Sequence, residues 1–135
     1  MILVDLNVVL DVVQARQPHY QASASVLDQV VQDQETGVVS AHAVTTLHYL
    51  VGRYRDRIQA DKLVDWLLRY FDIATVAASE LRRARALNWP DFEDAAVATA
   101  AEHYGCIAIV TRNLSDFQNS PVPALTPEEW LSRQS

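Results

Sequence analysis

Short apolar runs that alternate with helix-period segments constrain the fold of this chain more than any other feature. Continuous apolar runs indicate buried strands, whereas apolar residues that recur every three or four positions indicate amphipathic helices. The expected strands cover residues 2–6, 37–40, 71–76, 107–110 and 122–125. The expected helices cover residues 7–13, 19–32, 41–55, 61–70, 79–87, 91–104 and a short segment from residue 126. Such alternation predicts a layered α/β domain with a mostly parallel twisted sheet of four to five strands.

Local residues set the ends of several of these helices. Ser79 is expected to cap the helix that follows it, with Glu80 in the first turn. Asp91 opens the next helix and Gly105 closes it. The run Thr126-Pro127-Glu128-Glu129 combines an N-cap residue, a proline at the first helical position and an acid in the first turn.

Length and composition restrict the class of protein. At 135 residues the chain is expected to form a single domain over residues 1–135. Three glycines cannot supply the glycine-rich loops of P-loop or dinucleotide-binding proteins. No apolar run approaches the ~18 residues that cross a bilayer, no basic leader precedes the first strand, and the lone Cys106 cannot form an internal disulfide. We therefore expect a cytoplasmic protein.

Positive charge is scarce and comes almost entirely from arginine. The formal net charge is −6, and the chain has ten Arg and one Lys. An acidic protein repels nucleic acid overall, although local clusters of arginine can bind phosphate. Two clusters occur, within residues 53–57 and 82–85. The sequence leaves open whether they are solvated helix faces or phosphate-binding patches.

Acidic and amide residues are predicted to converge at one edge of the sheet. Asp5 ends the first strand, and Glu93 and Asp94 lie in the first turn of the helix that leads into the fourth strand. Asn113 and Asp116 follow that fourth strand. In a parallel α/β sheet every crossover helix begins at the carboxyl edge, where such sheets bind ligands. Carboxylates gathered there suit Mg²⁺ or Mn²⁺, which take oxygen ligands and retain waters, one of which can be the nucleophile.

Each acid also has a purely structural explanation. Asp5 is the hardest to explain in this way, because a buried and unpaired carboxylate is strongly destabilising. Asp94 can complete a capping arrangement with Asp91, and Glu93 can favour the helix dipole. Asp116 can be a turn residue.

Three motifs follow one another along almost the whole chain. They are Val4-Asp5-Leu6-Asn7-Val8 near the start, Asp91-Phe92-Glu93-Asp94-Ala95 later, and Thr111-Arg112-Asn113 with Asp116-Phe117 near the end. In this combination the chain resembles PIN domains, the nuclease fold of the toxins in VapBC-type toxin–antitoxin pairs and of several RNA-processing enzymes. The resemblance is closest to a subgroup of bacterial toxin-like proteins.

The resemblance implies a three-layer α/β/α fold and a metal-dependent endoribonuclease. Asp5, Asp94 and Asp116 would hold Mg²⁺ or Mn²⁺, and Glu93 or Asp116 would orient the attacking water. The residues implied to support the site or the substrate are Asn7, Thr46, Thr111, Arg112 and Asn113. The implied partners are single-stranded or looped RNA, a small antitoxin protein whose arginine enters the acidic pocket, and a second copy of the chain in a homodimer.

Two positions depart from the family pattern. Members usually carry a glutamate on the helix after the second strand, where counting from Ser40 arrives at Thr46 in this chain. Many members have an aspartate where this chain has Asn113. The charged set is therefore reduced to the three metal-binding acids, with Glu93 as the candidate substitute. Three carboxylates suffice for one Mg²⁺ with waters, and a second metal is less expected.

Two other interpretations use the same residues. Loss of the central glutamate is also typical of a degenerate PIN-like domain that binds RNA or a protein partner without cleavage. A phosphoryl-transfer domain, such as a response-regulator receiver, likewise places acids at a sheet edge. That class needs a lysine late in the chain, and the only lysine here, Lys62, lies within an expected helix.

Overall fold

The computed structural model describes residues 1–134 and has a five-stranded parallel sheet at its centre. The strands are β1 (Ile2–Val4), β2 (Gly37–Ser40), β3 (Asp72–Ala74), β4 (Ala108–Val110) and β5 (Ala124–Leu125). Their order in the sheet is β3-β2-β1-β4-β5, and each adjacent pair is parallel. The predicted α/β class is confirmed, and the sheet is parallel throughout.

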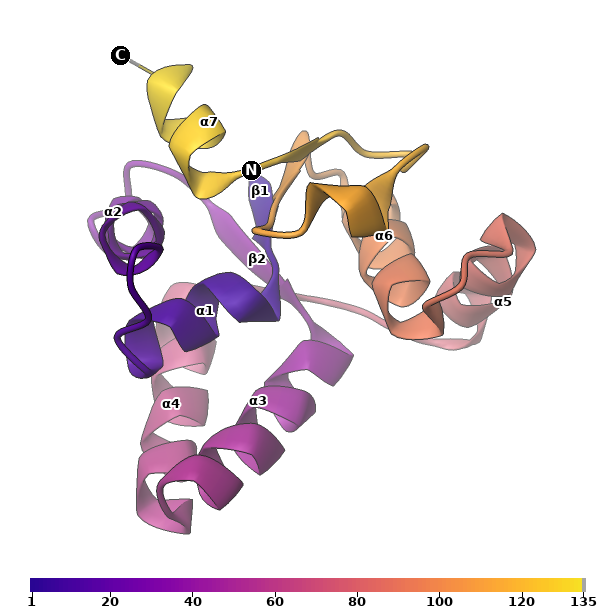
Figure 1. Cartoon of the computed structure of the whole chain (residues 1–135). Coiled ribbons are helices and arrows are strands. Elements are labelled where there is room, and N and C mark those ends of the chain that lie inside the picture. Colours follow the sequence, from indigo (N-terminus) through magenta and orange to yellow (C-terminus); the bar gives the residue numbers. More distant parts are fainter. Residues whose placement is uncertain (135) are drawn as a thin grey trace.

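Helices cover both faces of this sheet and so complete three layers. They are α1 (Leu6–Val13), α2 (Tyr20–Val31), α3 (Ala41–Tyr54), α4 (Arg57–Tyr70), α5 (Ala78–Leu87), α6 (Phe92–Tyr104) and α7 (Pro127–Ser132), with a 3₁₀ helix η1 (Leu114–Phe117). Figure 1 shows α1 to α4 and α7 on one side of the strands, and α5 and α6 on the other. No helix within residues 1–134 is long and apolar enough to cross a membrane.

The two faces of the sheet pack against separate cores because strand side chains alternate in direction. Ile2 and Val4 belong to the core beneath α1 to α4 and α7, whereas Leu3 between them belongs to the core beneath α6. Residues 95–101 of α6 are all buried, and five of these seven are alanines. Small side chains allow α6 to lie close to both the sheet and α5.

Several expected boundaries were wrong. The helix expected over residues 61–70 begins at Arg57, because the Asp56 carboxylate caps it by accepting the Gln59 backbone N–H at 2.8 Å.

Two further errors also concern helix capping. The first strand, expected over residues 2–6, ends at Val4 because the Asp5 carboxylate accepts the Leu6 backbone N–H at 2.8 Å and starts α1. Ser79 does not cap α5. The cap residue is Ala77, whose backbone N–H donates to the Glu80 carboxylate at 2.8 Å, and Ser79 lies inside the first turn. The Glu80 carboxylate therefore satisfies the backbone N–H of the cap residue, which is one of the two hydrogen bonds of a capping box.

The register of the central strands fixes where the functional residues emerge. Val4 of β1 pairs with Val110 of β4, so Asp5 and Thr111 leave the sheet side by side. The helices α1 and α3 begin directly at the ends of β1 and β2, as the parallel arrangement requires. The carboxyl edge of the sheet thus gathers residues from the beginning and the end of the chain.

Candidate functional site

Asp5 lies at the floor of the site and is held in one orientation by hydrogen bonds. Its Oδ2 accepts the Thr111 hydroxyl at 2.8 Å and the Asn7 side-chain amide at 3.3 Å. Its Oδ1 accepts the Leu6 backbone N–H at 2.8 Å. All three donors are uncharged, so the negative charge of Asp5 is solvated by dipoles and is not neutralised.

Asn7 and Thr111 join the floor of the site to the loop after β4. The Asn7 amide nitrogen donates to the Thr111 hydroxyl at 3.3 Å, and its amide oxygen accepts the Arg112 backbone N–H at 3.4 Å. The Asn113 backbone N–H donates to the Thr111 hydroxyl at 3.1 Å. Asn7 and Thr111 are both buried. Their shared hydrogen bonds fix the start of the loop that carries Asp116.

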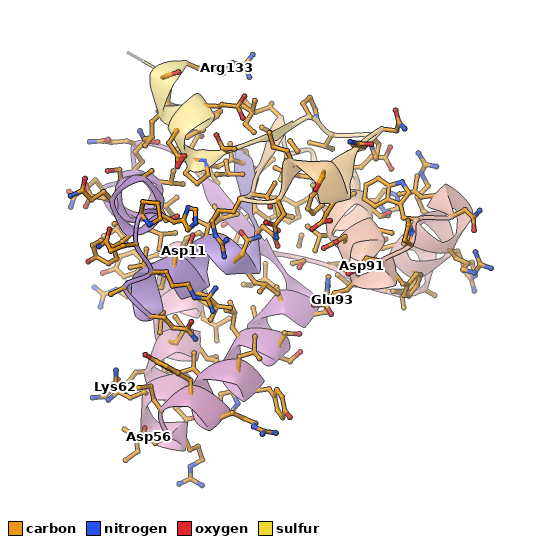
Figure 2. The ribbon with its side chains drawn as sticks, in the orientation of Figure 1. Asp11, Asp56, Lys62, Asp91, Glu93 and Arg133 are labelled. Atoms are coloured by element: carbon orange, nitrogen blue, oxygen red, sulfur yellow. The ribbon has the colours of Figure 1, made fainter. Side chains whose placement is uncertain are left out.

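The first turn of α6 supplies the acids that face this floor. Asp91 is the N-cap, and its carboxylate accepts the Asp94 backbone N–H at 3.1 Å. This bond uses only the backbone of Asp94, so the carboxylates of Glu93 and Asp94 take no part in capping the helix. Figure 2 labels Asp91 and Glu93 at this end of α6, near the start of α3.

These elements enclose a cavity of about 300 Å³ at the carboxyl edge of the sheet. Its lining consists of Asp5, Leu6, Asn7, Thr46, Asp91, Glu93, Asp94, Val97, Asn113 and Asp116. Seven of the residues predicted from sequence line it, all except Thr111 and Arg112. Thr111 lies fully buried beneath Asp5, and Arg112 turns towards α1. The cavity is therefore rich in carboxyl and amide oxygens from three separate segments, and Thr46 adds a hydroxyl from a fourth.

Mutual repulsion and burial disturb the ionisation of these acids. Burial raises the pKa of Asp5, although the hydrogen bonds from Thr111 and Leu6 partly oppose it. Burial raises the pKa of Asp94 to about 7, and the charges of Asp91, Asp5, Asp116 and Glu93 act in the same direction. A carboxyl group that is half protonated near neutral pH, beside other acids, marks a site where positive charge is missing.

The donor chemistry of the cavity fits a hard divalent cation. Within residues 1–134, no three His, Cys, Asp or Glu side chains stand close enough together to hold an ion as they are placed. Carboxylate and amide oxygens are nevertheless the ligands that Mg²⁺ prefers, and this ion keeps several waters and binds through only one or two carboxylates. The repulsion felt at Asp94 is relieved by such an ion.

A fully buried carboxylate behind the cavity was not identified from the sequence. Asp11 of α1 is 0% exposed, and its Oδ2 accepts the Ser23 hydroxyl at 3.1 Å and the Arg112 Nε–H at 2.8 Å. A second arginine, Arg16, lies 4.0 Å from Oδ1. The available signal was an aspartate inside the otherwise apolar run of residues 8–13. This acid anchors the loop after β4 to α1 through Arg112.

Two residues at or near the cavity, Asp91 and His42, have roles that the sequence did not indicate. Asp91 was interpreted only as a helix start, yet it lines the cavity beside Asp94. Both ring nitrogens of His42, near the start of α3, are buried and have no hydrogen-bond partner among residues 1–134. Burial lowers the pKa of His42, while the nearby Glu93 opposes this shift. No sequence spacing distinguishes His42 from an ordinary helical histidine.

The geometry defines a class of protein, namely a parallel α/β domain with an acid-lined cavity at the carboxyl edge of its sheet. A family model described as PIN domain matches residues 1–115. This chain belongs to the PIN domain family. A search of curated proteins found no match.

Solved structures that share this fold include a bacterial toxin–antitoxin complex and a bacterial toxin. A toxin–antitoxin complex from Klebsiella pneumoniae aligns with a TM-score of 0.73 and 18% identity, over 94% of this chain and 98% of that one. VapBC2 from Rickettsia felis, bound to a DNA fragment from its promoter, aligns with a TM-score of 0.72 and 18% identity over 93% and 98%. Mycobacterium tuberculosis VapC20, a sarcin–ricin loop cleaving toxin, aligns with a TM-score of 0.65 and 14% identity over 81% and 87%.

Proposed function

We propose that this protein is a metal-dependent endoribonuclease that acts as the toxin of a toxin–antitoxin pair. The observation that supports it most is the convergence of Asp5, Glu93, Asp94 and Asp116 on one cavity. Membership of the PIN domain family and the sarcin–ricin loop cleaving toxin among its structural neighbours support the same activity. The cavity opens at an edge of the sheet, where a single-stranded or looped RNA is easier to reach than a duplex.

Each residue of the cavity has a distinct proposed role. Asp5, Asp94 and Asp116 hold Mg²⁺ or Mn²⁺, directly or through water. When bound, the ion supplies positive charge that attracts the phosphate and lowers the pKa of water. Glu93 or Asp116 accepts the proton of the attacking water, in keeping with their position on the cavity wall.

Neutral residues complete the proposed site. Asn113 presents its side-chain amide to the phosphate from the cavity wall. Asn7 supports the site through its hydrogen bonds to Asp5, Thr111 and the Arg112 backbone. The Thr46 hydroxyl donates to the His42 backbone carbonyl at 3.1 Å, so its oxygen lone pairs are what it offers to a bound water. Thr111 orients Asp5 from below through its hydroxyl. Arg112 supports the loop after β4, because Asp11 holds its guanidinium at 2.8 Å.

Cleavage of RNA in the presence of Mn²⁺ tests this proposal. The wild-type protein is expected to cut a mixture of single-stranded and hairpin RNAs, and Asp5→Asn is expected to lose at least about 100-fold in rate. Asp65→Asn, at an exposed position on α4, is the matched control and should cut like the wild type. Equal rates for the wild type and Asp5→Asn would refute the assignment.

The partners follow from the same cavity. An acidic pocket without a counter-charge suits a small antitoxin protein that inserts an arginine, and two of the structural neighbours are described as toxin–antitoxin complexes or VapBC assemblies. We also propose a homodimer. Light scattering that shows a monomer at micromolar concentration would contradict the dimer.

One observation favours a second function, a domain that binds RNA or a protein partner without cleavage. Thr46 occupies the cavity wall where most family members are expected to place a glutamate, so the cavity has one negative charge fewer. In that case a gel-shift experiment should show RNA binding that is unaffected by Asp5→Asn, with no Mn²⁺-dependent products.

A further inference from the structure

A second hollow lies next to the acidic cavity, where α5 ends and α6 begins. Its volume is about 390 Å³, and it is lined by Ala84, Arg85, Asn88, Trp89 and Phe92. Phe92 is the first residue of α6 and stands in the sequence between Asp91 and Glu93, which line the acidic cavity. Figure 2 labels Asp91 and Glu93 at this end of α6. The two depressions therefore share one short segment of chain.

We propose that this hollow binds a base of single-stranded RNA that flanks the phosphate held in the acidic cavity. The inference rests on the proposed function, because it requires an RNA strand to lie across the start of α6. The hollow combines two aromatic side chains, one guanidinium and one amide. Aromatic faces stack on bases, while arginine and amide groups contact phosphates and base edges.

The two aromatic residues of the hollow differ in their exposure to solvent. Trp89 is half-buried and packs edge-on against Phe117, with ring centroids 5.9 Å apart and an interplanar angle of 86°. Phe92 is 48% exposed, although it belongs to a helix whose following turns are buried. An exposed apolar ring in the same hollow as a half-buried indole is available for stacking with a base.

The positive charge of Arg85 is also available to a ligand. Its Nη1 donates to the Asn88 side-chain oxygen at 3.4 Å, which draws the guanidinium towards the hollow. Among residues 1–134, Arg85 forms no ion pair with a carboxylate, whereas its neighbour Arg83 pairs with Glu102 at 3.2 Å. In a protein of net charge −6, an uncompensated arginine beside an acidic cavity is a local attraction for the strand that enters it.

The size and polarity of the hollow favour a nucleotide over a protein segment. A docked protein helix needs several apolar anchors along successive turns. Here the apolar surface is confined to Trp89, Phe92 and Ala84, and polar groups from Arg85 and Asn88 interrupt it. A volume of about 390 Å³ lies at the lower end of the range for small-ligand sites, which suits a single base.

Binding of a short RNA without cleavage tests the proposal. The probe is a fluorescein-labelled single-stranded RNA of eight nucleotides with one 2-aminopurine, measured by anisotropy and base fluorescence with the full-length protein. Ca²⁺ replaces Mn²⁺ in the buffer, so that an ion with the same preference for oxygen ligands offsets the charge of the acidic cavity. Arg85→Ala and Phe92→Leu are each expected to weaken binding about 5- to 10-fold. Phe92→Leu should also reduce the stacking-induced quenching of 2-aminopurine.

Two variants serve as matched controls. Arg82→Ala removes the same charge from an exposed position on α5 that does not line the hollow, and Tyr54→Leu removes an exposed ring at the end of α3. Each control is expected to change the Kd less than about twofold. Circular dichroism melting checks that Phe92→Leu is folded, and the exposed Arg85 provides a second substitution outside the core.

The outcomes separate this inference from the proposed nuclease activity. If the wild type cuts RNA with Mn²⁺ but Arg85→Ala and Phe92→Leu bind the probe like the controls, the base-binding hollow is wrong and the nuclease stands. If no RNA is cut but both variants still weaken binding, the hollow stands and the nuclease is wrong. The proposal that the hollow binds a base is also overturned if the wild type fails to bind the probe. It is overturned as well if Phe92→Leu loses a dimer but binds RNA like the wild type.

Discussion

Asp11 on α1 and Asp5 at the floor of the acidic cavity are both buried carboxylates, and their surroundings differ. Asp11 is fully buried, but Arg112 and Ser23 donate to it and Arg16 lies within 4.0 Å. Asp5 is 6% exposed and accepts only from uncharged groups. Figure 2 shows Asp11 on α1, well apart from Asp91 and Glu93 at the start of α6.

The difference separates an acid that serves the fold from acids that serve a ligand. Burial of a carboxylate is tolerated when a cation and hydrogen bonds accompany it, as they do for Asp11. Within residues 1–134, no cationic side chain pairs with Asp5 or Asp94. The pKa of Asp94 is raised to about 7 by burial and by neighbouring negative charge. Such a group destabilises the protein unless a ligand brings the charge.

The largest expected change in the free energy of unfolding comes from removal of Asp11, the acid that is paired with arginine. Asp11→Ala leaves the guanidinium of Arg112, whose side chain is 22% exposed, without its carboxylate and leaves Ser23 without an acceptor. Breaking a buried pair costs about 3–5 kcal/mol, and urea unfolding measures this loss.

The control for this substitution is Asp28→Ala, at an exposed position on α2. It should alter the free energy of unfolding by less than about 0.5 kcal/mol. If Asp11→Ala proves as stable as this control, the pairing of Asp11 with Arg112 has no structural role.

Removal of Asp94, an acid without a cationic partner, is expected to increase the free energy of unfolding. The pKa of Asp94 in the folded protein is about 7, above the ordinary value of 3.8, because of burial and the neighbouring acids. The folded state therefore binds more protons than the unfolded state between these values, and the stability contributed by this carboxyl is lost as the pH rises through that window. Without metal, Asp94→Asn should gain about 1–2 kcal/mol at pH ~8 and almost nothing at pH ~4.

Thermal unfolding followed across this pH range measures the gain. Asp65→Asn, on the exposed face of α4, should melt like the wild type at every pH. A stability difference between Asp94→Asn and the wild type that does not vary with pH would show that Asp94 titrates normally.

A smaller change in stability is expected when a further acid is added to the cavity that holds Asp5 and Asp94. Thr46→Glu places a further carboxylate on the cavity wall. Like-charge repulsion should lower the stability of the metal-free protein by about 1 kcal/mol and raise the affinity for Mn²⁺ about tenfold. Thr45→Glu, at the exposed neighbouring position on α3, should do neither. Equal Mn²⁺ affinities for the two variants would show that Thr46 does not face the ion.

The sequence predicted the layers and most element boundaries because each depends on local patterns. The apolar run of residues 2–4, the capping residue Asp91 and the closing Gly105 each specify their element without help from the rest of the chain. The boundary after Val4 was misplaced because Leu6, an apolar residue, continues the apolar run although Asp5 has already begun a helix.

The candidate site was predictable only where topology alone determines position. Residues at strand ends and helix starts, such as Asp5 and Asp94, are brought together by any parallel sheet of this connectivity. Arg112 follows a strand in the same way, but its side chain turns to Asp11. That choice depends on a partner 101 residues away, which no local pattern specifies.

Titration of the metal-free protein with Mn²⁺ by calorimetry tests most directly whether the unpaired acids form one ion site. The wild type and Asp65→Asn should give the same saturable binding heat, and Asp94→Asn should lose it. Identical binding curves for Asp94→Asn and the wild type would contradict the assignment of this cavity to a metal ion.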